Sequence, residues 1–357
     1  MTSNTAVTVS VVMSIFKEPK NWLKECIDSI LNQTYKDFEF IIINDNPNSD
    51  FNSILLNEYK SKDSRIKIIN NHENIGLTKS LNLGLKIANG KYIARIDGDD
   101  ISLPERLDLQ VKTLDKNIKI QLLGTQGRYI KGSNYNYGVM TRPITKSALS
   151  WVLSVQGSPI IHSSAMFRSS DKNGKKFYYN ESFRKKQDFE LWSRLFREGD
   201  IANIKYVGVL YRVHNAQTVK TYSKDDYLLT APVIKNNLEY IYKLPKIKAK
   251  NWSNYLNFSR FNKDFVKLSI LQIFPSLAKI ARSECITKDE LKHLDIFISH
   301  SYIKFSKMSL IDKSYKATFY SWFSVLKIKP LLALNYLLPR LIKIYVKNLL
   351  NPLNKTT

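Results

Sequence analysis

The sequence predicts an α/β fold in which a mainly parallel, doubly wound sheet is followed by a mainly helical C-terminal region. Short apolar runs alternate with amphipathic stretches along the first part of the chain, which is the pattern of a parallel sheet covered by helices. Polar residues follow three of the apolar runs, at the point where each expected strand ends. The alternation stops near residue 225, where aromatic and lysine-rich helical patterns begin.

The expected strands are short apolar runs bounded by turn-forming residues. They cover residues 7–13, 38–43, 66–69 and 92–96. The expected helices place apolar residues three or four positions apart, as a helix packed on a sheet does. They cover residues 22–31, 54–59 and 77–88, and a further helix begins at Pro104.

The middle of the chain has a less regular pattern. Residues 120–170 are typical of strands and loops, with one strand expected over Ile160–Phe167. An amphipathic helix is expected over Asp188–Phe196, and two short strands are expected within residues 201–213 around Gly208. We therefore expect one α/β domain over residues 1–225 and a helical region over residues 226–357.

Composition excludes several classes of protein. With 357 residues, 43% of them hydrophobic, the chain is too apolar for a disordered tail and too long for a single small module. Its two cysteines, Cys26 and Cys285, form no CxxC pair, so we expect a reducing compartment and neither a disulfide framework nor a zinc ribbon. No secretory signal pattern or uncharged apolar run of about 18 residues is present, so we expect a protein that is neither exported by that route nor membrane-spanning.

The formal net charge of +24 predicts an anionic partner. Residues 226–357 carry 22 Lys and Arg residues against 8 Asp and Glu residues, so the charge is concentrated in this region. Nucleic acid, acidic lipid and phosphorylated small molecules all have the complementary charge. A basic nucleic-acid-binding protein is therefore the alternative from a different functional class.

Three polar clusters are expected to meet at one edge of the sheet, because the carboxyl ends of parallel strands lie together there. Ser14 ends the first strand, Asp45 the second, and the run Asp97–Asp100 follows the fourth. Three carboxylates in this run favour a hard divalent cation shared with a diphosphate, although an acidic turn or helix N-cap is the alternative. For Asp45 the alternatives are a hydrogen-bond acceptor for a base or ribose and an Asx-turn.

At these residues the chain resembles the family-2 inverting glycosyltransferases of the GT-A fold, which use nucleotide-sugar donors. The resemblance covers about residues 7–220, and it is specific because several motifs occur in the family's order. The matching segments are Val9–Ser14, Ser29–Glu39, Ile43–Asp45, Asn74–Leu77, Asn82–Gly84, Ala88–Ile93, Asp97–Asp100 and Leu103–Arg106.

The resemblance implies roles on the side of the site that binds the nucleotide. Asp45 is similar to the acidic residue that contacts the base, and Ser14 and the loop to Glu18 line the same pocket. For Lys79, outside these matches, a phosphate contact and a solvated helix charge are the two alternatives.

Further roles concern the diphosphate and its metal ion, Mn²⁺ or Mg²⁺. Asp97 and Asp99 are similar to the family's metal-and-diphosphate motif, with Asp99 as the preferred direct ligand and Asp100 as the reserve. His214 resembles a histidine that completes the metal shell or contacts diphosphate, and a structural histidine is the alternative. Arg212 is expected to clamp phosphate.

On the acceptor side, Asp188 is the candidate catalytic base. Gln187 stands where the family usually has Glu, so the role of this position is open. Inverting transfer needs one carboxylate to take the proton of the acceptor hydroxyl, whereas hydrolysis needs two carboxylates beside the sugar. His162 resembles part of a loop near the acceptor pocket, with a buried or capping histidine as the alternative, and Trp151 is either a core residue or a stacking platform for an acceptor ring.

The C-terminal residues 331–350 predict a basic amphipathic helix, kinked at Pro339, that lies on an anionic membrane surface. Packing of its leucines on the catalytic domain or a partner is the alternative.

Together these observations favour a metal-dependent inverting hexosyltransferase. We expect transfer from a UDP-linked donor to a glycan acceptor, lipid-linked, in surface-polysaccharide, O-antigen, lipopolysaccharide or capsule biosynthesis. The expected location is cytoplasmic, peripheral on the inner face of the membrane. A processive polysaccharide synthase of the same fold is disfavoured because its Gln-x-x-Arg-Trp motif is absent. No nucleic acid is expected as a partner, because carboxylates at the strand ends repel a phosphate backbone.

Overall fold

The computed structural model describes residues 7–214, 224–258, 263–311 and 315–328. The chain divides into two compact units. The first comprises Met1–Lys146 and Ser158–Thr230, and the second comprises Ser147–Gly157 and Ala231–Thr357. A short internal segment is therefore grouped with helices that follow it by more than 70 residues in the sequence.

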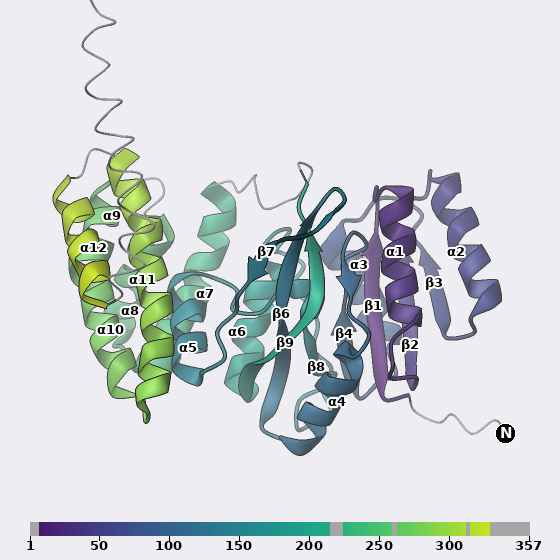
Figure 1. Cartoon of the computed structure of the whole chain (residues 1–357), viewed down its shortest axis with the longest axis horizontal. Coiled ribbons are helices and arrows are strands. Elements are labelled where there is room, and N and C mark those ends of the chain that lie inside the picture. Colours follow the sequence, from purple (N-terminus) through teal and green to yellow (C-terminus); the bar gives the residue numbers. More distant parts are fainter. Residues whose placement is uncertain (1–6, 215–223, 259–262, 312–314, 329–357) are drawn as a thin grey trace, which may run out of the picture. The chain divides into compact units, whose positions relative to one another are not determined.

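The first unit is built on a nine-stranded sheet with the order β3-β2-β1-β4-β8-β6-β9-β5, in which β7 pairs with β6 (Figure 1). β1, β2, β3 and β4 are parallel to one another, as are β6 and β9, whereas β8 runs antiparallel to both β4 and β6. The strands are β1 (Val9–Ile15), β2 (Phe38–Asn44), β3 (Ile66–Asn70), β4 (Tyr92–Arg95), β5 (Ile101–Ser102), β6 (Ile120–Lys131), β7 (Asn134–Met140), β8 (Met166–Arg168) and β9 (Asp200–Arg212). The predicted α/β class with a mainly parallel sheet is confirmed.

The helices of this unit follow the strands in the alternation that the sequence predicts. They are α1 (Lys20–Leu31), α2 (Asp50–Lys62), α3 (Leu77–Ile87), α4 (Arg106–Lys116) and α6 (Gln187–Glu198). α2 begins at Ser49, whose side chain accepts a hydrogen bond from the Asn52 backbone N–H at 3.2 Å, an N-cap contact. α3 begins after Gly76, which has φ of 85° and so suits a residue without a Cβ.

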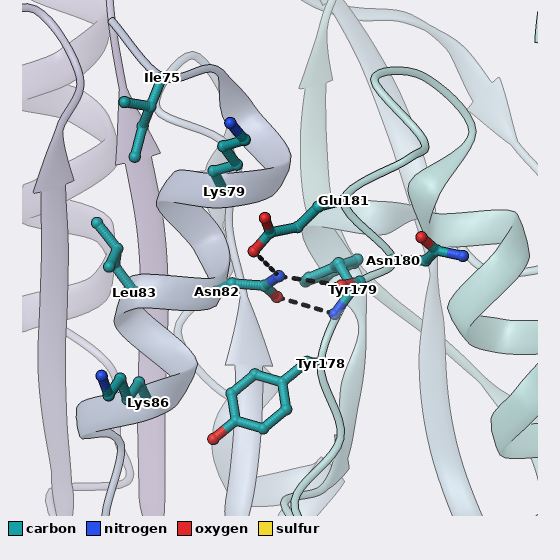
Figure 2. A pocket seen from close by; sticks show the side chains of 9 residues that line it. All are labelled: Ile75, Lys79, Asn82, Leu83, Lys86, Tyr178, Tyr179, Asn180 and Glu181. Carbon is teal, nitrogen blue, oxygen red and sulfur yellow. Dashed lines mark hydrogen bonds between the residues drawn. The ribbon is translucent and has the colours of Figure 1, made fainter. Parts of the chain in front are cut away.

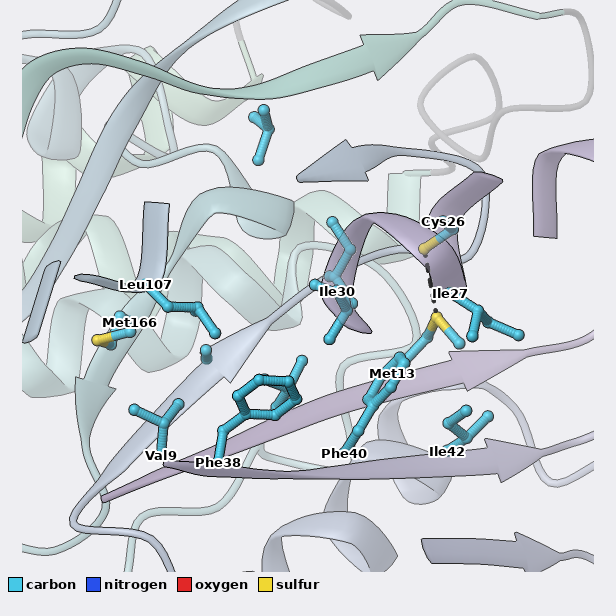
Figure 3. Close-up of a cluster of buried hydrophobic side chains, with 14 of the residues drawn as sticks. Val9, Met13, Cys26, Ile27, Ile30, Phe38, Phe40, Ile42, Leu107 and Met166 are labelled. Carbon is cyan, nitrogen blue, oxygen red and sulfur yellow. Dashed lines mark hydrogen bonds between the residues drawn. The ribbon is translucent and has the colours of Figure 1, made fainter. Parts of the chain in front are cut away.

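The core of the first unit lies around β1 and β2, all of whose residues are buried. Figure 3 shows side chains of these strands, among them Met13 and Phe40, meeting Ile27 and Ile30 of α1. The Cys26 thiol lies in the same cluster, with its Sγ atom 3.5 Å from the Met13 Sδ atom. This packing fixes the strand ends that carry the polar residues discussed below.

Two predicted strands differ from the structure. The strand expected over Ile160–Phe167 is a 3₁₀ turn, η1 (His162–Ser164), followed by the three-residue β8. Residues 201–213 contain one continuous strand, β9, rather than two. Gly208 lies within β9, where the Thr125 side chain comes so close that a larger residue would not fit. A Cβ atom at this position would lie 2.5 Å from Thr125 Oγ1.

The second unit is helical in the part that the structure describes. Its elements include the later turns of α5 (Lys146–Val155) and of α7 (Lys224–Tyr242), then α8 (Lys246–Phe258), α9 (Lys263–Leu268), the π-helical η4 (Ser269–Ile273), α10 (Phe274–Ser283), α11 (Lys288–Ile311) and α12 (Tyr315–Ile328). None of the helices within the described ranges is long and apolar enough to cross a bilayer. The helix predicted over residues 331–350 lies outside the described residues.

Candidate active site

The ends of β1, β2 and β4 bring the three predicted polar clusters to one edge of the sheet. Ser14 pairs in register with Ile43 of β2, and the Asp45 backbone N–H donates to the Ile15 carbonyl at 2.9 Å. β4 pairs with β1 from the other side, so the run after it begins beside the same edge. The sheet topology therefore produces the juxtaposition that parallel strands predict.

Asp45 is 2% exposed, and its carboxylate receives four hydrogen bonds from its own chain. The Asn71 side chain and the Ile75 backbone N–H donate to Oδ1 at 2.7 and 2.9 Å. The Asn74 side chain and the Gly76 backbone N–H donate to Oδ2 at 3.2 and 2.9 Å. A carboxylate offers about four acceptor positions, so these four hydrogen bonds use all the acceptor positions of Asp45 and hold the loop before α3.

Asp97 and Asp100 share one partner, the buried Ser163. The Ser163 Oγ atom lies 2.7 Å from Asp97 Oδ2 and also contacts Asp100 Oδ2. The Ser163 hydroxyl thus links the two carboxyl groups. Burial, followed by the charges of Asp99 and Asp97, raises the pKa of Asp100 well above its usual value.

Asp97 is held in its charged form. Burial acts to raise its pKa, but the charge of Arg95 and the hydrogen bonds from Ser163 and Arg95 outweigh burial, and the pKa is lowered. Arg95 contacts Asp97 Oδ1 directly and is itself 1% exposed. Asp97 therefore provides a fixed negative charge at the sheet edge.

Asp99 faces His214, which follows β9. Asp99 Oδ2 and His214 Nε2 are 2.8 Å apart, and both side chains are 22% exposed. Burial and then the charge of Asp97 raise the pKa of Asp99. The His214 ring packs on Trp22, with ring centroids 5.1 Å apart, so its position is set by α1.

Arg212 holds the acidic run Asp97–Asp100 in place through hydrogen bonds. Its backbone N–H donates to Asp100 Oδ1 at 2.9 Å, its Nε to the Asp99 carbonyl at 2.9 Å, and its Nη2 to Glu25 Oε2 at 2.5 Å. The guanidinium also stacks over Trp22, 4.9 Å from the ring centroid. Because Arg212 is 2% exposed and so engaged, it positions the run and the residue that leads to His214.

Glu18 adds a fourth carboxyl group to this edge. Burial raises the pKa of Glu18 to about 7, and the charges of Asp99 and Asp97 contribute, although hydrogen bonds from the backbone, including that of Phe16 at 2.7 Å, oppose the shift. Three of the four carboxyl groups therefore have raised pKa values, those of Glu18, Asp99 and Asp100. Burial is the largest cause for each of the three, and repulsion between the carboxylates adds to it. A bound cation would relieve that repulsion.

The donor set fits a divalent cation in part. Asp99 and His214 offer the oxygen and nitrogen ligands that Mn²⁺ accepts. Among the described residues, no group of three or more His, Cys, Asp or Glu side chains is arranged to hold a metal ion. A cation bound by this pair would thus take its remaining ligands from a diphosphate or from water.

His162 lies behind the cluster and is neutral at physiological pH. Its Nε2 atom is 2.9 Å from the Tyr179 hydroxyl, and its ring packs edge-on to Trp192. Burial and then the charge of Arg95 lower the pKa of His162 to about 4, while the charges of Asp97 and Asp188 act in the opposite direction. Asp188 is therefore close enough to His162 to act on its titration.

Asp188 lies in the first turn of α6 and has no hydrogen-bond partner among the residues that the structure describes. Its charge acts on Tyr179 and Arg142 as well as on His162. The preceding Gln187 is 6% exposed, so its side chain is turned into the unit. A half-buried carboxylate in this position is available to accept a proton from a ligand.

Arg142, which the sequence did not single out, interacts electrostatically with Asp188. Its Nε atom is buried with no hydrogen-bond partner in the described structure, and its Nη2 contacts only the weak acceptor Met140 Sδ, at 3.4 Å. Burial lowers its pKa, while Tyr129, Asp188 and Tyr211 act to raise it. Arg142 lies in a loop after β7 and belongs to no motif. Its interaction with Asp188 can therefore be seen only in the folded structure.

Two candidate residues lie apart from the carboxylate cluster. Lys79 is exposed on α3, where it faces a groove (Figure 2). Trp151 is 0% exposed in α5, and its indole N–H donates to Ser301 Oγ at 2.9 Å. Its ring packs on Phe274 in the second unit, so of the two alternatives for Trp151 the structure supports the core residue.

Sequence comparison relates the chain to known glycosyltransferases. The model of the family described as Glycosyl transferase family 2 matches residues 10–174. An uncharacterized glycosyltransferase of Methanocaldococcus jannaschii is 35% identical over 277 residues, which is 74% of this chain and 88% of that protein. The putative glycosyltransferase EpsE of Bacillus subtilis is 37% identical over 198 residues, covering 55% of this chain and 69% of that protein.

Solved structures show the same fold. S. aureus TarS 1-349 in complex with UDP-GlcNAc superposes with a TM-score of 0.56 at 13% identity, covering 90% of this chain and 91% of that one. The mannosyltransferase PcManGT from Pyrobaculum calidifontis, in complex with GDP-Man and Mn2+, gives a TM-score of 0.50 at 12% identity, covering 91% of this chain and 88% of that one.

Proposed function

Because the chain belongs to glycosyl transferase family 2, we propose that it transfers a hexose from a UDP-linked donor to a hydroxyl group of a glycan acceptor. The observation that carries the proposal is Asp188, a carboxylate in the first turn of α6 that has no hydrogen-bond partner among the described residues and whose charge acts on His162. The UDP-GlcNAc bound to TarS supports the choice of nucleotide.

In this proposal the nucleotide lies at the ends of β1 and β2, beside Ser14 and Glu18. A direct bond from Asp45 to the base would compete with the four donors that its carboxylate already accepts. We therefore assign Asp45 to shaping the base pocket through the loop that it holds, and we assign the contacts with the nucleotide to that loop and to Ser14.

The diphosphate is assigned to the acidic run. Asp99 and His214 would hold Mn²⁺ or Mg²⁺, with Asp97 beside them and Asp100 as the reserve ligand. Such an ion supplies positive charge that stabilises a departing diphosphate. The Mn2+ in the PcManGT structure supports this assignment, as do the raised pKa values of Asp99 and Asp100. Arg212 holds the run in place rather than clamping phosphate directly.

The chemical step requires one base. The Asp188 carboxylate takes the proton of the acceptor hydroxyl while that oxygen forms a bond with the anomeric carbon of the donor. The bond between this carbon and the diphosphate oxygen breaks on the opposite face, and the electron pair leaves with the nucleotide diphosphate. Attack and departure on opposite faces invert the configuration at the anomeric carbon.

The proposed acceptor is a lipid-linked glycan at the cytoplasmic face of the membrane. The proposed process is the assembly of a surface polysaccharide. Supporting this assignment are the net positive charge of residues 226–357 and the partly unpaired guanidinium of Arg142 near Asp188. An anionic membrane attracts the positively charged residues 226–357. A phosphate or carboxylate on the acceptor pairs well with the guanidinium of Arg142.

A donor panel tests the proposed function. The full-length protein is incubated with UDP-, GDP-, dTDP- and CMP-sugars in Mn²⁺ or in EDTA, and nucleotide release and thermal stabilisation are followed. The proposal predicts a metal-dependent response to a UDP-hexose. A folded protein that responds to none of the donors, but binds arbitrary DNA in a salt-dependent way that survives Asp99→Ala, would favour the nucleic-acid-binding alternative.

A further inference from the structure

A groove of about 810 Å³ runs along the outer side of α3. Its two walls are α3 and the segment Tyr178–Glu181, which precedes α6 (Figure 2). Two of the residues that line it are linked to the proposed site: Ile75 lies in the loop assigned to the nucleotide, and Tyr179 contacts His162.

The two walls are fastened together, so the groove is formed before a ligand arrives. The Asn82 side chain donates to the Tyr179 carbonyl at 3.0 Å and accepts from the Tyr179 backbone N–H at 2.9 Å. It also donates to Glu181 Oε1 at 3.0 Å, and Thr78 Oγ1 donates to the Phe183 carbonyl at 2.7 Å. A preformed groove loses little conformational entropy when it binds a ligand.

Glu181, an exposed carboxylate of the groove, is bonded to Asn82, and the other exposed polar side chains are of the kinds that bind an acidic sugar chain. Tyr178 is 37% exposed and offers a ring face to the C–H groups of a sugar. Asn180 offers an amide to sugar hydroxyl groups. Lys79 and Lys86 are exposed seven positions apart on α3, which separates them by about 10 Å along the helix axis, so they can meet separate negative charges on one oligosaccharide.

The groove shares a wall with the candidate active site. Tyr179 is 4% exposed and lies between the two. Its backbone is fixed to Asn82 in the groove, while its hydroxyl is 2.9 Å from His162 Nε2. The charges of Asp188 and Asp97 both act on Tyr179. Tyr179 thus joins the wall of the groove to His162.

We propose that this groove binds the part of an anionic glycan acceptor that lies away from the reacting hydroxyl group. The inference rests on the proposed function in one respect, namely that the bound glycan is the acceptor. The negative groups of the glycan pair with Lys79 and Lys86, one of its sugar rings stacks on Tyr178, and its reactive end reaches past Tyr179 toward Asp188.

Binding of defined oligosaccharides to the full-length protein tests the groove. The probes are a hexamer of galacturonic acid, which has one carboxylate per sugar, and neutral maltohexaose. The variants are Lys86→Glu and Tyr178→Ala, which change side chains without removing any hydrogen bond given above. Lys60→Glu on α2 and Tyr137→Ala on β7 are the matched controls, because both side chains are exposed on other elements.

The expected result is tighter binding of the galacturonate hexamer than of maltohexaose, weakened about tenfold by each groove variant and unchanged in both controls. Equal binding by the groove variants and the unmodified protein, equal binding of the two hexamers, or no binding of the acidic hexamer would overturn the inference. Nucleotide release from UDP-sugars by the unmodified protein, measured without oligosaccharide, tests the proposed function separately. A protein that binds the hexamer in the groove but turns over no donor would thus refute the function and not the groove.

Discussion

His214 Nε2 lies 2.8 Å from Asp99 Oδ2, although the two residues are 115 positions apart in the sequence. The contact joins the end of β9 to the run that follows β4, and Arg212 secures both sides of it. The pair stands at an edge where Glu18 and Asp100 also have raised pKa values. An acidic edge with one facing imidazole is suited to a divalent cation and a diphosphate.

Asp99→Ala and His214→Ala are each expected to abolish Mn²⁺-dependent binding of UDP, because each removes one of the two proposed ligands. Titration calorimetry with and without Mn²⁺ measures the effect, and His293→Ala in the second unit is the control. If Asp99→Ala keeps the full Mn²⁺ dependence, the ligand role belongs to Asp97 or Asp100 instead.

Asp45→Ala is expected to lower the free energy of unfolding by roughly 2–4 kcal/mol, because it leaves the partly buried backbone N–H groups of Ile75 and Gly76 without their acceptor. Urea denaturation measures the change. Asp50→Ala, an exposed acidic residue in the first turn of α2, is expected to cost under about 1 kcal/mol. Equal stability of the two variants would contradict the assignment of Asp45 to the loop.

Arg142→Met is expected to raise the free energy of unfolding by about 1 kcal/mol and to lower glycosyl transfer. The substitution removes a buried guanidinium nitrogen that lacks a partner and fills the space with an apolar side chain. Urea denaturation and transfer assays are run in parallel, with Lys119→Met as an exposed control. Undiminished transfer by Arg142→Met would remove this residue from the site.

The neutral state of His162 predicts a pH dependence of stability. Its pKa is about 4 in the folded chain and near 6.5 when unfolded, so the unfolded state binds more protons between these values. The contribution of His162 is therefore fully present above about pH 6.5 and is lost as the pH falls toward 4. Between pH 7 and pH 5 the unmodified protein should lose about 2 kcal/mol more than His162→Gln, by urea denaturation at each pH. Equal losses would show that His162 is protonated in the folded protein.

Much of the fold was predictable because the patterns that determine it are local. β1 and β2 are continuous apolar runs, and α1 and α3 repeat apolar residues at helical spacing. The carboxyl ends of parallel strands lie at the same edge of a sheet, so the sequence also predicted that Asp45 and the run after β4 share that edge.

The features that were missed or left open depend on contacts between distant parts of the chain. Gly208 has the sequence pattern of a strand break, yet it lies within β9 because Thr125 of β6 approaches it closely. For Trp151 the sequence left a core residue and a stacking platform open, and the contacts with Ser301 and Phe274 decide for the core residue. The partly unpaired state of Arg142 depends on what the fold places around it, and no local pattern contains that information.

The central claim is that Asp188 is the base of a metal-assisted glycosyl transfer. The most direct test measures transfer from the UDP-hexose identified by the donor panel, together with UDP binding, for the unmodified protein, for Asp188→Asn and for Asp50→Asn as the control. The account predicts that Asp188→Asn lowers transfer by roughly two to four orders of magnitude while UDP binding is retained, and that Asp50→Asn changes neither. Transfer by Asp188→Asn at the rate of the unmodified protein would contradict the account.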